Sequence, residues 1–264
     1  MKITIQAMME ELMRPVGQLE HTVDRLLFGD LNTEVTGVVT AFMPTQYVIE
    51  QAVALGANLI ISHEGPFFSH QDQEGVHADD PVYAAKKRLI RESGIAIFRW
   101  HDYIHRYKPD WITQGLVQAF GWEDAVIKHR PEAAVVQLPG SALRDIAVDI
   151  KERLGIPYVR IMGDPDQICA RAGVLVGYRG GGGSVIPLME QEALDLVVYG
   201  EGPEWESPEY VRDAVRQGRK KALIVIGHAE SEVPGMNLLA RNLQERYPDL
   251  QVHTVSEKPL FRVV

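Results

Sequence analysis

The stretch Leu59-Ile60-Ile61-Ser62-His63-Glu64-Gly65-Pro66 decides the fold of this chain. Its apolar, β-branched run predicts a buried strand, and two residues that stop regular structure follow directly after an imidazole and a carboxylate. The carboxyl ends of strands in open α/β sheets are where ligands and active sites collect. A functional site is therefore expected at His63 and Glu64.

The same pattern occurs a second time further along the chain. The first copy runs from Gly37-Val38-Val39 to Glu64-Gly65-Pro66, and the second from Gly173-Val174-Leu175 to Glu201-Gly202-Pro203. In each copy a charged helical stretch and a further strand then lead to a histidine, first His101 and later His228. Several short matches in the same order favour a duplicated strand-helix-strand-helix-strand unit over chance resemblance between α/β segments.

Strands and helices alternate along almost the whole chain, which is typical of an α/β protein. We predict two related three-layer α/β domains with mixed sheets, formed by a first repeat over residues 1–130 and a second repeat over residues 131–264. Residues 19–28 carry apolar side chains at helical spacing and predict a helix, as do residues 7–14.

Other segments of the chain give more local predictions. A helix over residues 143–154 is expected to follow Ser141 as its cap, and the last long helix is expected from about residue 233 to 247. Residues 67–80 are polar and lack periodicity, which predicts a mobile loop beside His63. The basic residues around Lys86 predict a solvated helix face.

Composition excludes several classes of protein. The 264 residues, of which 45% are hydrophobic, are enough for a substantial core. A net charge of −9 and a pI near 5.5 argue against a general nucleic-acid surface. The single cysteine, Cys169, excludes an intramolecular disulfide. No signal-peptide core and no membrane-spanning run is present, so a cytoplasmic, soluble protein is expected.

A set of imidazoles and carboxylates lies at or just beyond the ends of the predicted strands. This combination suits divalent ions such as Zn, Mn, Fe, Co or Ni, whereas oxygen ligands alone would suggest Mg or Ca. The residues of the set are His63, Glu64, His101, His105, His228 and Glu232. The last two are four residues apart, so they share one face if the chain is helical there. A lone histidine is usually structural, but this set favours a metal site.

These residues carry a resemblance to a known family. The chain resembles the NIF-three-like dinuclear metal-centre family, whose members often carry the label GTP cyclohydrolase I type-two homologue. The family's hallmarks are a strand ending in His-His-Pro, a later His-x-x-x-Asp and a C-terminal Gly-His-x-x-x-Glu. Here they correspond to His63-Glu64-Gly65-Pro66, to His101 with His105, and to Gly227-His228 with Glu232. The resemblance covers residues 37–105 and 173 to about 245.

Two positions depart from the family pattern. Glu64 stands where the family has a histidine, and His105 stands where it has an aspartate. Three imidazoles and two carboxylates are retained over the five positions, which we interpret as a compensated exchange that keeps two metals neutralised. The competing interpretation is a diverged member with one metal or none. His101 matches a family position expected close to the metals, as a ligand or as a donor that orients one.

The resemblance implies a dinuclear centre in the cleft between the two repeats, and ring-shaped hexamers. Two metals about 3.5–4 Å apart would share a bridging carboxylate and activate a bridging water, which is hydrolase chemistry. The first hypothesis is therefore a hydrolase of a nucleotide-like or phosphorylated small molecule, with Glu64 or Glu232 assisting proton transfer. The second is a metal-binding or regulatory assembly protein without turnover.

Groups that would bind the charge of a substrate are less clearly marked. Cations near the predicted site in sequence are Arg99, Arg106, Lys108 and the run Arg219-Lys220-Lys221, but each is more simply explained as a surface cation. The stretch Gly180-Gly181-Gly182-Gly183-Ser184 offers backbone N–H groups for a phosphate, but we favour a tight strand-to-helix turn there. No Ser/His/Asp nucleophile signature is present.

Overall fold

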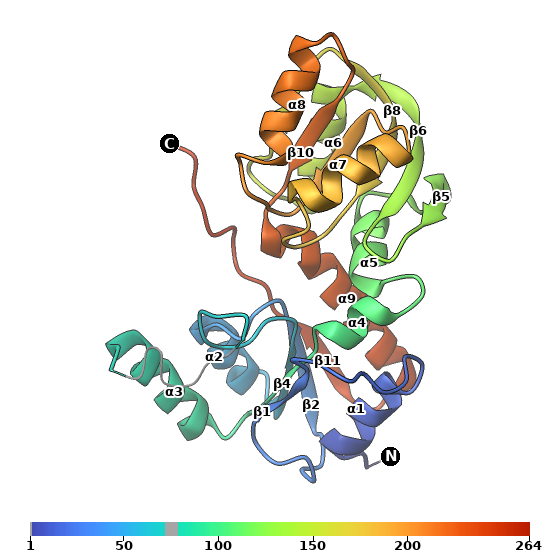
Figure 1. Cartoon of the computed structure of the whole chain (residues 1–264). Helices are drawn as coiled ribbons and strands as arrows, with labels where there is room; N and C mark the ends of the chain where they lie inside the picture. Colours follow the sequence, from blue (N-terminus) through green and yellow to red (C-terminus); the bar gives the residue numbers. More distant parts are fainter. Residues whose placement is uncertain (1, 72–78) are drawn as a thin grey trace. The chain divides into compact units, whose positions relative to one another are not determined.

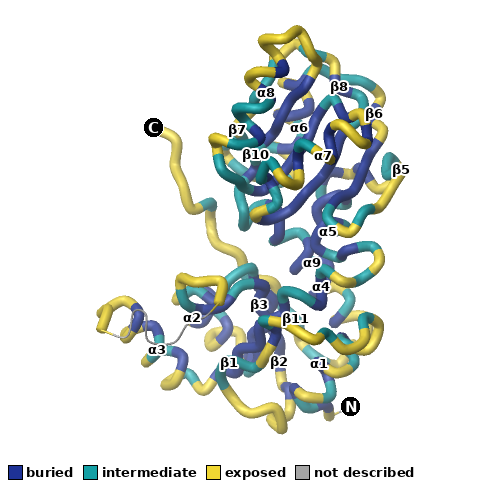
Figure 2. The backbone as a smooth tube through the Cα atoms, viewed as in Figure 1, coloured by how far each residue is buried: buried dark blue, intermediate teal, exposed yellow. Residues whose placement is uncertain are grey.

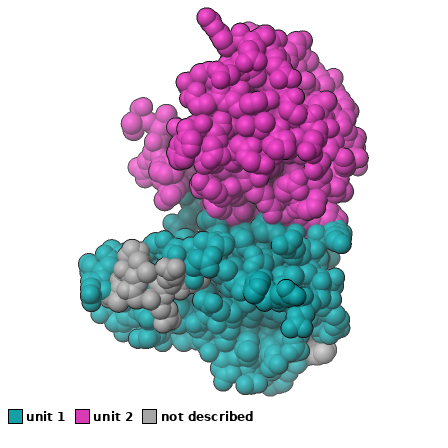
Figure 3. Space-filling model, viewed as in Figure 1, with its two compact units in different colours: residues 1–108, 236–258 teal, residues 109–235, 259–264 magenta. Residues whose placement is uncertain are grey.

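The computed structural model describes residues 2–71 and 79–264 and divides into two compact units. Unit 1 consists of Met1–Lys108 and Met236–Lys258, and unit 2 of Pro109–Gly235 and Pro259–Val264 (Figure 3). One boundary lies inside a single helix, α9 (His228–Arg246). The division into two sequence repeats at residue 130 remains a prediction. The compact units have different bounds from these repeats, because the last strand of the chain joins the sheet of unit 1.

Unit 1 contains a five-stranded sheet with the strand order β1-β4-β3-β2-β11. Figure 1 labels β1, β4, β2 and β11 of this sheet. Its strands are β1 (Arg25–Phe28), β2 (Gly37–Ala41), β3 (Leu59–Ser62), β4 (Ala96–Arg99) and β11 (Gln251–Thr254). The strands β4, β3, β2 and β11 run parallel, and β1 pairs antiparallel with β4 at the edge. Every residue of β2, β3 and β4 is buried, as expected for parallel strands covered on both faces (Figure 2).

Helices supply the cover of this sheet. They are α1 (Ile5–Met13), α2 (Gln46–Ala54), α3 (Pro81–Ser93), α4 (Asp102–Arg106) and the later part of α9. Side chains of α2 and α3 share one core with alternate residues of the central strands, including Val39, Ile60 and Ile97. The start and end of α3 follow from sequence: Asp80 accepts hydrogen bonds from two N–H groups of the first turn, and Gly94 ends the helix with a positive φ.

Unit 2 contains a six-stranded sheet with the strand order β5-β6-β8-β9-β10-β7. Its strands are β5 (Val126–His129), β6 (Ala134–Ala142), β7 (Arg160–Met162), β8 (Ile168–Val174), β9 (Leu196–Tyr199) and β10 (Ala222–Val225). The strands β8, β9 and β10 run parallel, and β7 pairs antiparallel with β10. The strands β2, β3, β4 and β1 have the same arrangement in unit 1, so the predicted relation between two mixed-sheet α/β domains is confirmed.

The helices of unit 2 complete its layers. They are α5 (Trp111–Ala119), a short 3-10 helix (Glu123–Ala125), α6 (Leu143–Leu154), α7 (Gly182–Gln191), α8 (Ser207–Arg216) and the start of α9. Apolar side chains of α7 and α8 share a core with Val135, Val197 and Leu223 of the sheet. The intervening strand residues, such as Val198 and Ile224, are also buried, so both faces of this sheet are covered (Figure 2).

Three of the predicted helix positions need correction. Residues 19–28 are not helical: β1 occupies the end of this segment, because its backbone pairs with β4 and the preceding residues bond to the start of α4. The cap of α6 is Ala142 rather than Ser141, and it makes no side-chain cap hydrogen bond. The helix α9 begins at His228, five residues before the predicted start, with Pro234 inside it.

The predicted loop over residues 67–80 is only partly visible. Residues 67–71 form bends and turns, whereas residues 72–78 lie outside the described residues. No helix in the described part of the chain is both long and apolar enough to cross a membrane.

The helices α5 and α9 approach each other closely at two glycines of unit 2. A Cβ atom on Gly115 would lie 2.5 Å from Cα of Gly235, so no larger residue fits without backbone movement. We expect Gly115→Ala to lower the free energy of unfolding by about 2 kcal/mol. Urea unfolding checks this, with Gly183→Ala in α7 as the control, because a Cβ there meets no atom within 4 Å. An equal effect of both changes would contradict close packing as the cause.

Candidate metal centre

Four of the predicted site residues of unit 1 follow two neighbouring strands. His63 and Glu64 come directly after β3, whereas His101 and His105 lie at the start and in the body of α4, after β4. Because β3 and β4 run parallel in register, with Ser62 opposite Arg99, their carboxyl ends lie together. The sheet therefore brings residues almost forty positions apart in sequence to one edge.

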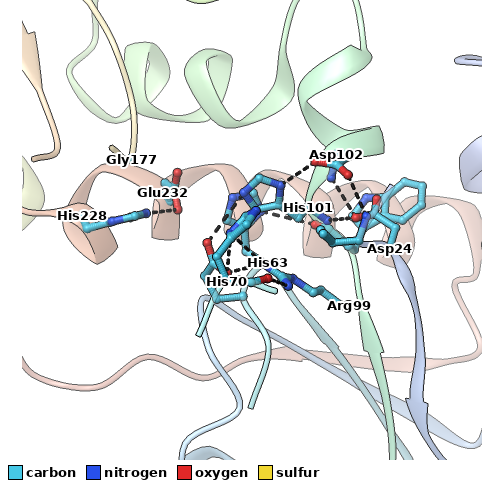
Figure 4. Close-up of polar contacts among 12 residues, drawn as sticks. Asp24, His63, His70, Arg99, His101, Asp102, Gly177, His228 and Glu232 are labelled. Atoms are coloured by element: carbon cyan, nitrogen blue, oxygen red, sulfur yellow. Dashed lines mark hydrogen bonds and ion pairs between the residues drawn. The ribbon is translucent and has the colours of Figure 1, made fainter. Parts of the chain in front are cut away.

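His63, His101 and His105 form a compact cluster, which we call the imidazole group; Figure 4 labels His63 and His101. One ligand nitrogen from each of the three rings lies within 4.8 Å of the others. The ring centroids of His63 and His101 are 4.5 Å apart in a stacked arrangement, and the ring of His105 lies 5.0 Å from that of His63. His63 is fully buried and the other two are partly buried. Three imidazoles are a ligand set that zinc and similar ions accept.

Hydrogen bonds orient two of these rings toward the centre of the group. Nδ1 of His63 lies 3.3 Å from the Trp100 carbonyl oxygen, which can only accept, so this nitrogen carries the proton. Nδ1 of His101 lies 2.9 Å from Oδ1 of Asp102 and donates to it in the same way. In both rings Nε2 then keeps its lone pair for a ligand. Carboxylate or carbonyl partners on the other nitrogen are the usual support of metal-binding histidines.

The charge state of His101 also suits a ligand. Burial lowers its pKa to about 4, and the nearby His63 and His105 act in the same direction, against the effect of Asp102. The ring is therefore neutral near pH 7, which is the form that binds a metal. Burial by itself raises the pKa of the Asp102 carboxyl. The hydrogen bonds from His101 and from the Val23 N–H nevertheless hold this pKa below its usual range.

The lowered pKa of His101 predicts a loss of stability in acid for the metal-free protein. Its pKa is about 4 in the folded chain and 6.5 as a free group, so between these values only the unfolded chain binds the proton. The free energy of unfolding should therefore fall by up to about 3 kcal/mol as the pH drops from 6.5 to 4. Asp102 contributes outside this window, because its stabilisation is lost only below pH 3.8.

Urea unfolding with a chelator present, at several pH values, measures this dependence. The comparison is between the native chain and His101→Gln, whose unfolding free energy should depend less steeply on pH. Equal slopes in the two proteins would show that another group is responsible.

Asp24 holds the start of α4, the helix that follows His101 and carries His105. Its Oδ1 accepts hydrogen bonds from the backbone N–H groups of His101 and Asp102, both at 2.8 Å, and its Oδ2 accepts one from Tyr103 at 2.9 Å. These are N–H groups of the first turn of α4, which the helix itself cannot satisfy. Asp24 is buried, which raises its pKa, whereas the three N–H donors lower it. A residue distant in sequence thus fixes the position of two imidazoles.

Glu64 lies beside the imidazole group, but its shortest contact is with Arg99. Its Oε2 accepts a hydrogen bond of 2.5 Å from Nη2 of Arg99, and its Oε1 lies 3.7 Å from Nε2 of His101. Nη2 of Arg99 also lies 3.0 Å from Nδ1 of His70, and Nη1 donates to the His70 carbonyl oxygen at 2.5 Å (Figure 4). Arg99 is fully buried, so its interpretation as a surface cation was wrong.

A second group of potential ligands therefore exists in unit 1. Glu64, His70 and His101 also offer ligand atoms within 4.8 Å of one another. This group differs from the imidazole group because the Arg99 guanidinium contacts two of its members, Glu64 and His70, and this positive charge disfavours a further cation. His70 was not predicted as a site residue. The sequence did contain a signal for it, because His70 lies in the segment that directly follows His63 and Glu64.

The predicted pair of unit 2 is also formed. His228 begins α9 directly beyond β10, and its Nε2 lies 3.3 Å from Oε2 of Glu232 one turn later. Nδ1 of His228 lies 3.5 Å from Oε1 of Glu201. Glu232 is buried, and a Cβ on Gly177 would collide with its carboxylate. The predicted shared helix face of His228 and Glu232 is confirmed.

Comparison with known proteins identifies the family. The sequence model of the family Duf34/NIF3 (NGG1p interacting factor 3) matches residues 3–259. The chain belongs to this family.

Relatives of this Duf34/NIF3 chain are distant in sequence and similar in fold. A GTP cyclohydrolase 1 type 2 homolog of Clostridium acetobutylicum is 23% identical over 238 residues, which are 87% of this chain and 84% of the relative. The crystal structure of the Staphylococcus aureus hypothetical protein SA1388 matches with a TM-score of 0.78 and 21% identity over 99% of both chains. The Bacillus cereus protein related to NIF3 matches with a TM-score of 0.78 and 16% identity over 100% of this chain and 99% of that one. The predicted NIF3-like fold is confirmed.

Three of the other basic residues considered from the sequence of this Duf34/NIF3 chain have structural partners. Lys221 is buried and donates to the carbonyl oxygens of Met189 and Leu194 at 3.3 and 3.0 Å, and it also lies 3.1 Å from Glu190. Arg219 forms an ion pair with the same glutamate at 3.2 Å. Lys86, predicted on a solvated face, is buried and donates to the Pro66 carbonyl oxygen. Their positive charges are thus used within the fold.

The glycine-rich stretch of unit 2 forms the start of α7. The Gly182 N–H, which a phosphate would need, donates to Oε2 of Glu206 at 2.6 Å. A carboxylate from the chain itself therefore occupies this helix start. The preferred interpretation as a strand-to-helix turn agrees with this contact. Cys169 is buried.

Proposed function

We propose that this chain binds divalent metal ions and uses them to hydrolyse a nucleotide-like or phosphorylated small molecule. The observation that carries the proposal is the imidazole group, in which three histidines converge within 4.8 Å at the carboxyl end of a sheet. The donor set suits Zn, Mn, Fe, Co or Ni. The proposal keeps the two ions per chain that the family resemblance implies, with ligands from unit 1 and from the His228 and Glu232 pair of unit 2.

The residues of unit 1 have distinct roles in this proposal. His63, His101 and His105 would hold the ion, and Asp102 and the Trp100 carbonyl oxygen fix the protons of two of these rings on Nδ1. The ion would supply Lewis-acid activation of a water molecule near neutral pH. Burial of His63 limits access of bulk water from the sheet side.

Two carboxylates are proposed to move protons. Glu64 has one oxygen held by Arg99, and its other oxygen faces His101 at 3.7 Å, where it can accept a proton beside the imidazole group. Glu232 takes the same role beside His228 in unit 2. The roles of Glu64 and Glu232 in proton transfer are proposals, and so is the assignment of metal ions to the nearby histidines.

The test combines metal content with turnover. Purified chain is loaded with Zn or Mn, its metal content is measured by elemental analysis, and a panel of nucleotides and phosphoesters is screened for hydrolysis. We expect about two equivalents of metal in the native chain and fewer in His228→Ala. We expect turnover that is lost in His101→Ala while the native oligomeric state is kept. A metal-free native protein would overturn the proposal.

A second candidate function is a metal-binding or regulatory assembly protein without turnover, with the hexamer that the resemblance implies. The observation in its favour is that Arg99 already neutralises Glu64, a carboxylate beside the imidazole group. In this case metal would bind, no substrate of the panel would be turned over, and His228→Ala would dissociate the oligomer. Light scattering of native and variant proteins distinguishes the two functions.

A further inference from the structure

We infer that Arg99 serves as a built-in cation that keeps a second metal ion away from Glu64 and His70, so that unit 1 by itself holds a single ion on the imidazole group. This inference rests on the metal binding proposed above. It states that the ligands of unit 1 hold one ion. It also gives Arg99, a residue of a buried strand, the role of excluding a second ion.

The first observation is that one nitrogen of Arg99 contacts a potential ligand atom of Glu64 and a potential ligand atom of His70. Nη2 lies 2.5 Å from Oε2 of Glu64 and 3.0 Å from Nδ1 of His70. Arginine has donors only, so Nδ1 of His70 must present its lone pair to the guanidinium. The guanidinium therefore occupies this lone pair and one of the two Glu64 oxygens, whereas the other oxygen, Oε1, faces His101 at 3.7 Å.

The second observation is the fixed charge of the guanidinium. Arginine keeps its proton throughout the pH range of proteins, so a change of pH does not remove this positive charge. Its side chain is 1% exposed, and electrostatic repulsion is only weakly screened in such surroundings. A divalent ion bound by Glu64 and His70 would therefore have to displace the side chain of Arg99 or bind against its charge.

The third observation is the charge balance of the Glu64 and Arg99 pair. Glu64 is paired with Arg99 at 2.5 Å. The two opposite charges cancel, so the pair adds no net charge to the site. A glutamate that instead served a second ion would need its carboxylate free of the guanidinium. Glu64 thus lies next to the imidazole group as a neighbour of the ion.

The two ligand groups of unit 1 share His101 as their third residue, so they compete for it. His101 belongs to both groups, and its Nε2 is the nitrogen left for a ligand once Nδ1 donates to Asp102. One Nε2 lone pair binds one ion. An ion held by His63, His101 and His105 therefore removes the third ligand from the Glu64 and His70 group.

The experiment counts ions in a chain whose unit 2 ligands are removed by His228→Ala and Glu232→Ala. This chain, loaded with Co or Zn, is compared with the same chain carrying Glu64→Gln, Arg99→Met or His105→Ala. We expect about one equivalent in the parent chain and in Glu64→Gln, because glutamine still accepts from Arg99 and is not needed for the ion. We expect His105→Ala to lose the ion and Arg99→Met to gain a second, weaker equivalent.

Arg88→Met is the matched control, because Arg88 is exposed on α3 of the same unit and its loss should leave the count unchanged. Loss of the ion in Glu64→Gln would overturn the inference, since Glu64 would then be a ligand. Two equivalents in the parent chain, or no gain in a folded Arg99→Met, would also overturn it. If Arg99→Met fails to fold, the Glu64→Gln result decides. A native chain with no metal at all would instead mean that the proposed function fails.

Discussion

His101→Ala is expected to weaken metal binding by the native chain roughly 100-fold or more, since changes even to residues behind the ligands cost 10–100-fold in affinity. The reason is that His101 belongs to both ligand groups of unit 1 and presents Nε2 to them, with Nδ1 held by Asp102 at 2.9 Å. Titration of Zn against a competing chelator measures the change. Circular dichroism of the same samples checks that the variant is folded.

His21→Ala is the matched control for this variant. His21 is an exposed histidine of unit 1 that belongs to neither ligand group, so its loss should leave the affinity unchanged. Unchanged affinity in both variants would place the metal elsewhere and would leave the imidazole group with a structural role.

Asp24→Ala is expected to lower the free energy of unfolding by about 4 kcal/mol, because it leaves three N–H groups at the start of α4 without their charged acceptor. Urea unfolding measures the change. Since α4 carries His105 and follows His101, metal affinity should fall together with stability. A change in stability below about 1 kcal/mol would contradict this role of Asp24.

Asp24→Asn separates hydrogen bonding from charge in the same position. The amide oxygen can still accept from the His101 and Asp102 N–H groups, which share one oxygen in the native chain, but the Tyr103 N–H loses its acceptor. We expect an intermediate loss of stability. Asp30→Ala is the control, because Asp30 is exposed and its carboxylate accepts from the N–H and the side chain of Asn32 in its own turn.

The positions of the ligands in unit 1 could be predicted because they depend on local patterns. The run of four buried residues Leu59–Ser62 predicts a parallel strand, and His63 and Glu64 must then emerge at its carboxyl end. The i,i+4 spacing of His228 and Glu232 likewise predicts a shared helix face, which the 3.3 Å contact confirms. Each of these inferences needs only the period of one strand or helix.

The partners of these ligands could not be predicted, because they come from distant parts of the chain. Asp24 bonds to N–H groups 77 to 79 residues away, and Arg99 reaches Glu64 over 35 residues. Apolar spacing near Asp24 instead predicted a helix, which strand pairing with β4 overrode. Arg99 did carry a signal: an arginine in a strand buried on both faces needs a charged partner.

The most direct test of the metal centre is a crystal structure of the Zn-loaded chain with anomalous scattering measured at the zinc absorption edge. We predict an anomalous peak bonded to Nε2 of His63 and of His101 and to a ring nitrogen of His105, with Arg99 still paired to Glu64. A peak bonded to Glu64 and His70 with Arg99 displaced, or no peak at the imidazole group, would contradict the account.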